Sequence, residues 1–306
     1  MNLLISLATR GRPVQVLDTV RRSVDNWRVP NTRMVIQVDA DDAATIGYLA
    51  ANPLPLRVSV NVQPREDTIA AKWNRILTEP ADVYMSAADD DPYITPCYDA
   101  KILEAASRFP DGIGIVYGHM ANASFTGIAA PTRKLCDKLG WIFPPLFPYW
   151  FVDHWVDDIV RMIGRISFAD VRTDQSRAGH TQEMREPGWW ATWFDAAYRM
   201  RRAQAAAIIQ GKDFKSPAWL KSLLLAHHPM IEYRSRWVNE NVRRDGRLQQ
   251  ASLPVADARY QRVKASAVAM IPHLLDDYGM DPAEAAMFRN ALLAPTQISN
   301  LRRAFG

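Results

Sequence analysis

Short apolar runs alternate with segments of helical spacing along the first half of the chain. The runs lie at residues 2–8, 33–39, 56–62, 82–88 and 112–118. Between them, apolar side chains recur every three or four residues, as in Val16, Val20 and Val24, which places them on one face of a helix. This alternation predicts an α/β fold with a mostly parallel, Rossmann-like central sheet and helices on both of its faces.

The pattern changes near residue 185, after which strand-like runs fade. Helical spacing then dominates, at residues 187–210, 216–228, 258–279 and 282–293. We therefore predict an α/β domain at 1–185 and a helical C-terminal extension at 186–306. The extension is expected to pack on the core or to form an interface, either a homodimer or a peripheral membrane contact.

An aromatic cluster opens this helical region. Its members, at helical spacing, are Trp189, Trp190, Trp193 and Phe194. Sugar stacking, a lid and an interfacial membrane contact are its functional interpretations. We expect packing of the helices instead, because aromatic side chains dominate protein cores.

Polar residues directly follow three of the predicted strands. They are Thr9, Arg10, Gly11 and Arg12 after the first, Asp39, Asp41 and Asp42 after the second, and Asp89, Asp90 and Asp91 after the fourth. In mostly parallel sheets the ligand binds at the carboxyl ends of the strands. The sequence therefore predicts that its polar groups gather at one edge of the sheet.

The acid triplet has two interpretations. Asp89 and Asp91, separated by one residue, can share a hard divalent cation such as Mg²⁺ or Mn²⁺, which prefers oxygen ligands and often takes phosphate oxygens as well. The alternative is a solvated turn, since Pro92 and Pro96 follow closely. The triplet alone does not decide between them.

The basic loop and the second strand end also have alternatives. Arg10 and Arg12 precede a predicted helix start at Pro13, which suits a pyrophosphate or nucleotide. A plain connecting loop is the alternative. Asp39 can hydrogen-bond a base or a ribose, or it can cap the helix that follows, a role that Asp41 and Asp42 fit better.

A third group of acids lies in the predicted helix at 151–165. Asp153 and Asp157 are four residues apart and so share a helix face, as do His154 and Asp158. Acids near a helix N-terminus are also favoured by its dipole. His180 lies in a polar stretch after the α/β region, where a histidine is either a surface residue or a late metal or phosphate ligand.

The composition is that of an ordinary soluble protein. Of 306 residues, 48% are hydrophobic and 23% charged, and 37 bases against 33 acids give a net charge of +4, too small and dispersed to indicate nucleic-acid binding. Cys97 and Cys136 form no paired motif, which excludes a cysteine zinc site. No run approaches the roughly 18 apolar residues of a membrane span. We expect a cytoplasmic or membrane-peripheral protein.

The order of these features resembles the glycosyltransferases of the GT-A fold, in particular glycosyltransferase family 2. The segments that carry the resemblance are "LLISLATRGRP", "MVIQVDADD", "TIAAKWNRIL" with Asn74, "ADDDPYITP" and "VDHWVDDIVRMIGR". Each segment is short, and their order along residues 1–180 is the specific signal. The chain departs from the family at Val152, where a Glu is usual, and at Lys72-Trp73, where a small residue and Arg are usual.

The resemblance implies a nucleoside diphosphate sugar as donor and a saccharide or other hydroxyl as acceptor. It places the nucleotide-sugar against Thr9, Arg10, Arg12, Asp39, Asn74, Asp89 and Asp90. It implies a Mn²⁺ or Mg²⁺ ion on Asp91, with Asp89 and His180 completing the site; the chemistry does not require Asp90 as a ligand. Asp153, or alternatively Asp157, would take the acceptor proton, and the reaction would invert the anomeric configuration.

Two other functions fit the same pattern. A sugar-phosphate nucleotidyltransferase would keep the fold, but such enzymes usually carry a glycine-rich loop after the first strand, and here only Gly11 is present. A non-catalytic binding or scaffold protein would use the C-terminal helices to dock on a partner. The retained acids favour a catalytic site over this last alternative.

Overall fold

The chain forms two compact units. The first combines Met1–Pro145 with Gly164–His180, and the second combines Leu146–Ile163 with Thr181–Gly306. The computed structural model describes residues 1–119, 128–148, 151–174, 176, 187–209, 257–276 and 280–293. The division lies near the expected boundary at 185, but residues 146–163 group with the C-terminal helices and not with the α/β unit.

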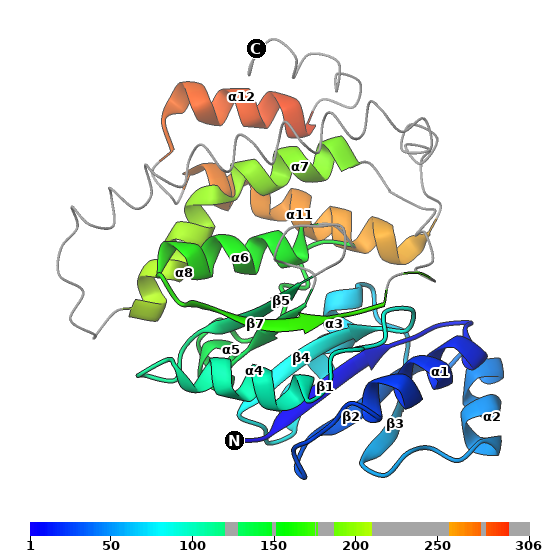
Figure 1. Ribbon diagram of the computed structural model, residues 1–306. Helices are drawn as coiled ribbons and strands as arrows, with labels where there is room; N and C mark the ends of the chain where they lie inside the picture. The colour runs from blue at the N-terminus through cyan, green and yellow to red at the C-terminus, as the bar shows by residue number, and fades with distance from the viewer. Residues whose placement is uncertain are drawn as a thin grey trace. The chain divides into compact units, whose positions relative to one another are not determined.

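A four-stranded parallel sheet is the centre of the first unit (Figure 1). Its strands are β1 (Leu3–Ala8), β2 (Arg33–Asp39), β3 (Val58–Gln63) and β4 (Val83–Ala88), in the order β3-β2-β1-β4. All six residues of β1 are buried, as expected of a central strand that is covered on both faces. The predicted α/β fold with a mostly parallel sheet is confirmed.

Helices cover both faces of this sheet (Figure 1). On one face, Leu3, Ile5 and Leu7 pack in a core that also includes residues of α1 (Pro13–Val24) and α4 (Tyr98–Ser107). The opposite face lies against α3 (Ile69–Asn74) and the short 3₁₀ helix η1 (Arg75–Thr78), which both contact β1. Helix α2 (Ala43–Ala51) packs beside α1.

The fifth predicted strand belongs to a second, three-stranded sheet. This sheet has the order β6-β5-β7, from β5 (Ile115–His119), β6 (Ala129–Pro131) and β7 (Ile166–Arg172). The pairing of β5 with β6 is antiparallel and that with β7 is parallel. An antiparallel bridge from Val83 to Thr132, just before α5 (Arg133–Leu139), links it to β4.

The second unit is helical and has an aromatic core. Its described helices are α6 (Val152–Met162), α7 (Pro187–Ala196), α8 (Tyr198–Ile209), α11 (Ala258–Asp276) and α12 (Pro282–Leu293). Phe147 lies with its ring centroid 4.8 Å from that of Trp193 and 5.7 Å from that of Trp155. None of the described helices is long and apolar enough to cross a membrane. The predicted helix at 216–228 lies outside the described residues.

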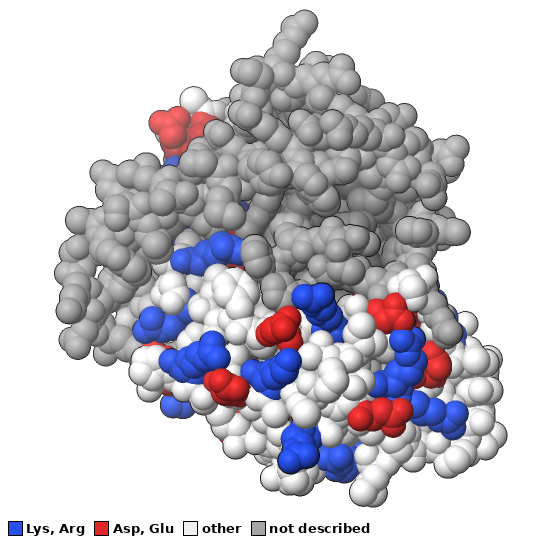
Figure 2. Space-filling model, viewed as in Figure 1, with Lys and Arg blue, Asp and Glu red and all other residues white. Residues whose placement is uncertain are grey.

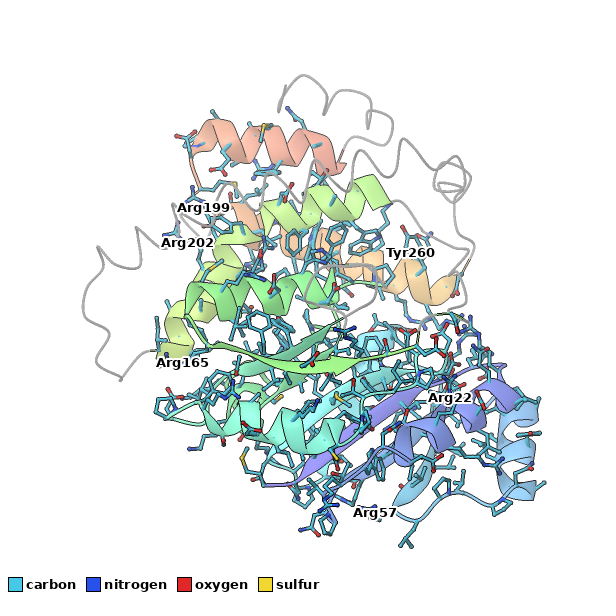
Figure 3. All side chains as sticks on the ribbon, in the orientation of Figure 1. Arg22, Arg57, Arg165, Arg199, Arg202 and Tyr260 are labelled. Atoms are coloured by element: carbon cyan, nitrogen blue, oxygen red, sulfur yellow. The ribbon has the colours of Figure 1, made fainter. Side chains whose placement is uncertain are left out.

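The aromatic cluster of α7 is part of this core. Trp189, Trp190, Trp193 and Phe194 are all at most 8% exposed. The tryptophan indoles also have partners: Trp190 donates to the hydroxyl of Tyr260 on α11 at 3.3 Å, and Trp193 donates to the Ala267 carbonyl at 3.3 Å. Tyr260 is labelled in Figure 3. The cluster therefore packs helices, as expected, and does not form an exposed stacking surface.

Candidate active site

The register of the central sheet brings three strand ends to one edge. Ala8, the last residue of β1, lies opposite Gln37 of β2 and opposite Ala88 of β4. Thr9, Asp39 and Asp89 therefore meet at the carboxyl edge of the sheet. This grouping of polar residues is the one that the strand pattern predicted.

The acid triplet is tied to the basic loop. The hydroxyl of Thr9 donates to Asp89 Oδ2 at 2.7 Å, and Arg12 Nη1 donates to Asp89 Oδ1 at 3.0 Å. The same Arg12 nitrogen also donates to Asp90 Oδ2 at 3.0 Å. The Thr19 hydroxyl, on α1, donates to the Asp89 carbonyl at 2.7 Å. These contacts fix the position of the Asp89 carboxylate and of its backbone.

Burial sets the electrostatics of Asp89. The residue is 6% exposed, and this desolvation raises the pKa of its carboxyl group, while the hydrogen bond from Thr9 and the charge of Arg12 lower it. Burial lowers the pKa of Arg12, but the charges and hydrogen bonds of Asp89 and Asp90 together outweigh it, so the Arg12 pKa is raised overall. The guanidinium is thus a fixed positive charge between two carboxylates.

A second ion-pair cluster surrounds Asp39. Arg10 Nη1 donates to Asp39 Oδ2 at 3.2 Å, and the same guanidinium binds both carboxylate oxygens of Asp41, at 2.6 and 3.0 Å. Lys72 Nζ lies 3.0 Å from Asp39 Oδ1 and donates to the Thr9 carbonyl at 2.7 Å. Asp39, 3% exposed, is therefore bracketed by cations from two elements.

Lys72 is a site residue that sequence reasoning did not select. It is 5% exposed, and burial lowers the pKa of its ammonium group, against the effect of Asp39. Its position gave a signal, because it lies three residues after Ile69 and four before Ile76, a spacing that places the three on one helix face. A lysine in such a face needs a buried acid as partner.

The helix-cap interpretation holds for Asp42. It is the N-cap of α2 and accepts from the Thr45 amide at 3.2 Å. Its other oxygen accepts from the Gly11 amide at 2.7 Å. Gly11 has φ +67°, a left-handed conformation that glycine adopts without strain, and Asp42 thereby fixes the turn that carries Arg10 and Arg12.

The loop after Asp91 is anchored on both sides. The Tyr93 hydroxyl donates to the Ser86 carbonyl at 2.9 Å, and burial, together with the charge of Asp91, raises the pKa of this phenol. Beyond it, Asp174 donates its backbone amide to the Pro92 carbonyl at 2.9 Å. Asp174 also accepts from Arg22 of α1 at 2.5 Å (Figure 3). The acid triplet is thus part of an ordered loop.

Asn74 has a structural role in the described protein. Its side-chain oxygen accepts from the Ile142 amide at 2.8 Å and from the Phe143 amide at 3.1 Å. Its nitrogen donates to the Phe143 carbonyl at 2.8 Å. These bonds hold the segment after α5, so the contacts of Asn74 differ from the nucleotide contact expected of it, which stays a prediction.

The two candidate bases both lie on α6, in the second unit, but they differ in environment. Asp153 is in the first turn, its side chain 35% exposed, and its Oδ1 lies 2.8 Å from His154 Nδ1. Asp157 is 1% exposed and is bound by Arg161 Nε through both carboxylate oxygens, at 3.0 and 2.9 Å. Of the two, Asp153 is the accessible carboxylate.

Asp158, which shares a helix face with His154, binds an arginine of another helix. Asp158 is fully buried and forms an ion pair at 2.9 Å with Arg201 of α8, which is also fully buried. Arg201 lies over the ring of Phe194, 3.7 Å from its centroid. This arrangement packs α6 against α8, and His154 has Asp153 as its neighbour instead.

The acid triplet fits a positive centre. Arg12 Nη1 occupies a point 3.0 Å from one oxygen of Asp89 and 3.0 Å from one of Asp90, so the protein already places a cation between these carboxylates. Within the described ranges, no group of three or more His, Cys, Asp or Glu side chains is arranged as a metal site. His180, the third expected ligand, lies outside those ranges.

The fold and this edge define an α/β protein whose charged strand-end loops meet at the carboxyl edge of a parallel sheet. Its fold is similar to that of S. aureus TarS 1–349 in complex with UDP-GlcNAc, with a TM-score of 0.52 at 13% identity over 99% of this chain and 92% of that chain. The complex of the same protein with UDP gives a TM-score of 0.48 at 13% identity over the same shares, 99% and 92%. Longer S. aureus TarS gives 0.47 at 12% identity, over 100% of this chain and 52% of that chain. No family model and no curated protein sequence matches the chain.

Proposed function

We propose that this protein is a glycosyltransferase of the GT-A, family 2 type, which transfers a sugar from a nucleoside diphosphate sugar to an acceptor hydroxyl. The observation that carries the proposal is the edge at which Thr9, Arg10 and Arg12 meet Asp39 and Asp89. The fold similarity to TarS, whose complex contains the nucleotide sugar UDP-GlcNAc, supports it.

The basic loop is proposed to hold the donor. Arg10 and Arg12 present guanidinium groups, which bind phosphate oxygens in pairs. Asp39 would accept a hydrogen bond from the base or the ribose, and Lys72, 3.0 Å away, orients that carboxylate. The Asp42 carboxylate accepts from the Gly11 amide and so fixes the turn that carries both arginines.

A divalent ion, Mn²⁺ or Mg²⁺, is proposed at the acid triplet, where it would offset the charge that develops on the leaving diphosphate. Asp91 is its expected ligand, with Asp89 and His180 assisting. Asp89 is held in place by Thr9 and Arg12. Oxygens of the diphosphate would complete the ligand set, as is usual for Mg²⁺.

Asp153 is the proposed base. Its exposed carboxylate would take the proton of the acceptor hydroxyl as that oxygen attacks the anomeric carbon. A single displacement from the face opposite the leaving group inverts the configuration there. His154, whose ring nitrogen is 2.8 Å from Asp153 Oδ1, would orient the carboxylate.

The test is to incubate the protein with Mn²⁺ and a panel of nucleotide sugars that includes UDP-GlcNAc, with saccharide acceptors, and to measure nucleoside diphosphate release. We expect release with at least one donor, and its loss in Asp91→Ala with the fold intact by circular dichroism. Asp170→Asn, at a carboxylate 70% exposed on β7, is the control and should keep full activity.

Other outcomes separate the other functions. Pyrophosphate formation from a sugar phosphate and a nucleoside triphosphate would replace our proposal with a nucleotidyltransferase. If the protein neither turns over a substrate nor binds a nucleotide, the scaffold function is the one that remains. A homodimer or a membrane contact through the C-terminal helices remains a prediction, which sedimentation and vesicle binding can check.

A further inference from the structure

One guanidinium nitrogen bridges two adjacent carboxylates at the candidate site. Arg12 Nη1 donates to Asp89 Oδ1 and to Asp90 Oδ2, each at 3.0 Å. The side chains of the two acids are 9% and 11% exposed, whereas that of Arg12 is 37% exposed. The acids are therefore held in the protein, while the cation reaches them from the solvent side.

We propose that Arg12 and a divalent cation compete for Asp89, and that a donor diphosphate takes up the Arg12 guanidinium and so frees the Asp89 carboxylate to join Asp91 at the cation. Nucleotide and metal then bind with positive coupling, and Arg12 is the residue that couples them. The inference rests on the proposed function, because the diphosphate is that of the donor.

Electrostatics supports this exchange. Two carboxylates close together and largely buried need a positive charge between them, which Arg12 supplies in the protein alone. A divalent ion placed there would repel the guanidinium at short range. The Arg12 guanidinium cannot lose its proton, so it must move away from the acids when the ion binds. A phosphate that accepts two hydrogen bonds from it is as good a partner as the carboxylate that it gives up.

The loop geometry allows Arg12 to move without disturbing its neighbours. Arg12 is the N-cap residue of α1 and contributes no side-chain cap bond there. The loop itself stays fixed by Asp42 on Gly11 and by Lys72 on the Thr9 carbonyl. Asp89 keeps its hydrogen bond from the Thr9 hydroxyl during the exchange. Only the guanidinium needs a new position.

The test measures Mn²⁺ binding by the paramagnetic resonance signal of the free ion, with and without UDP. In the natural protein we expect weak binding of Mn²⁺ alone and binding at least about fivefold tighter with UDP, within the usual range of coupling between sites. In Arg12→Gln, Mn²⁺ alone should bind about tenfold more tightly than in the natural protein, and UDP should add little. Arg12→Lys, which keeps the charge, should fall between them.

Arg10→Gln is the matched control. It removes a guanidinium from the same loop, one that binds Asp39 and Asp41 but neither Asp89 nor Asp90. If it raises the affinity for Mn²⁺ alone as much as Arg12→Gln does, the effect is general charge removal and the exchange is overturned. Unchanged affinity in folded Arg12→Gln would also overturn it.

Calorimetric titration with UDP in the presence of EDTA separates the two proposals. UDP binding without detectable Mn²⁺ binding in any variant would overturn the exchange and leave the nucleotide site standing. No UDP binding, with or without Mn²⁺, would count against the proposed function itself. Thermal unfolding of each variant confirms that it is folded.

Discussion

The Lys72–Asp39 pair is the most buried charged contact of the candidate site. The two side chains are 6% and 5% exposed, and Lys72 also holds the end of β1 through the Thr9 carbonyl. Breaking such a pair leaves an uncompensated buried charge, which costs far more than the pair contributes when intact. Lys72 therefore joins the ends of β1 and β2 at the point where the donor is expected.

Replacing Lys72 with Met should lower the free energy of unfolding by about 3 kcal/mol, because the buried Asp39 then loses its buried cation and keeps only the more exposed Arg10 and Arg65. Urea denaturation followed by circular dichroism measures this. Lys134→Met is the matched control, since Lys134 also donates to a carbonyl, that of Asp111, but is exposed. A loss no larger than that of the control would show that Lys72 does not compensate Asp39.

The two candidate bases should respond differently to the same change. Asp153→Asn should lower kcat by about 10²–10⁴-fold with UDP binding and stability unchanged, since its carboxylate is partly exposed and would act only on the acceptor. Asp157→Asn removes a buried charge bound by Arg161 and should mainly destabilise the protein. If Asp157→Asn instead loses catalysis and keeps its fold, the base is Asp157 and not Asp153.

Single residues show what the sequence could and could not predict. The strand-end position of Asp39 and Asp89 followed from the apolar pattern, because strand register brings parallel strand ends together. The pairing of Arg12 with Asp89 did not, since these residues lie 77 positions apart and only the finished sheet joins them. The nucleotide contact of Asn74 stays a prediction, and its partners at Ile142 and Phe143 lie in a loop whose path the sequence does not indicate.

At the scale of elements, α1 is fastened to the end of β7. Arg22 of α1 donates to Asp174 at 2.5 Å, and the Ser176 amide donates to the other oxygen at 3.0 Å. The hydrogen bond from Arg22 is the largest cause of a lowered pKa for Asp174, followed by the bonds from Ser176. Because Asp174 also binds the Pro92 carbonyl, this contact supports the loop that carries the acid triplet.

This contact predicts a pH-dependent stability difference. A carboxyl group with a pKa below its unfolded value of 3.8 stabilises the fold above that pH, and the gain disappears as the pH falls. Arg22→Gln should therefore be less stable than the natural protein between pH 5 and 7, and this difference in stability should shrink below about pH 4. Urea unfolding across this range measures it.

Arg108→Gln is the control for this series. Its ion pair with Glu104 is exposed at 60% and 73%, so solvent should screen most of its effect. A stability difference for Arg22→Gln that stays constant down to pH 2 would show that the ion pair with Asp174 does not cause it. The comparison thus isolates the effect of the Arg22–Asp174 contact.

Helices and strands were predicted well where apolar residues recur along the chain at a regular spacing. β1, β2 and β4 lie where the apolar runs placed them, and α1 begins at Pro13 as its sequence indicates. The run at 112–118 was assigned to the central sheet, but β5 lies in a second sheet and pairs antiparallel with β6. The three residues of β6 are too short to show a pattern, so this edge could not be predicted.

At the scale of the whole molecule, the chain divides into an α/β unit and a helical unit. The sequence placed the change of character near 185 but assigned α6 to the first unit. Its membership of the second depends on contacts such as those of Trp155 with Trp193 and Gln204, which no local pattern reveals. The aromatic cluster of α7 was predicted correctly as a packing feature, because its spacing fits a buried helix face.

The charge of the molecule is also a whole-chain property. Figure 2 shows lysines and arginines interspersed with acids over the described surface in that view. With a net charge of +4, this distribution gives no extended basic face there that would indicate nucleic-acid binding. Among the cations of the first unit, Arg10, Arg12 and Lys72 pair with acids at the strand ends.

The central claim is that the carboxyl edge of the sheet binds a nucleoside diphosphate. Amide resonances of the isotopically labelled protein, titrated with UDP in the presence of Mg²⁺, test it most directly. The account predicts saturable shifts concentrated at Thr9–Arg12, Asp39–Asp42 and Asp89–Asp91, and their loss in Arg10→Gln/Arg12→Gln. Saturable shifts that map elsewhere, or no shifts at millimolar UDP, would contradict it.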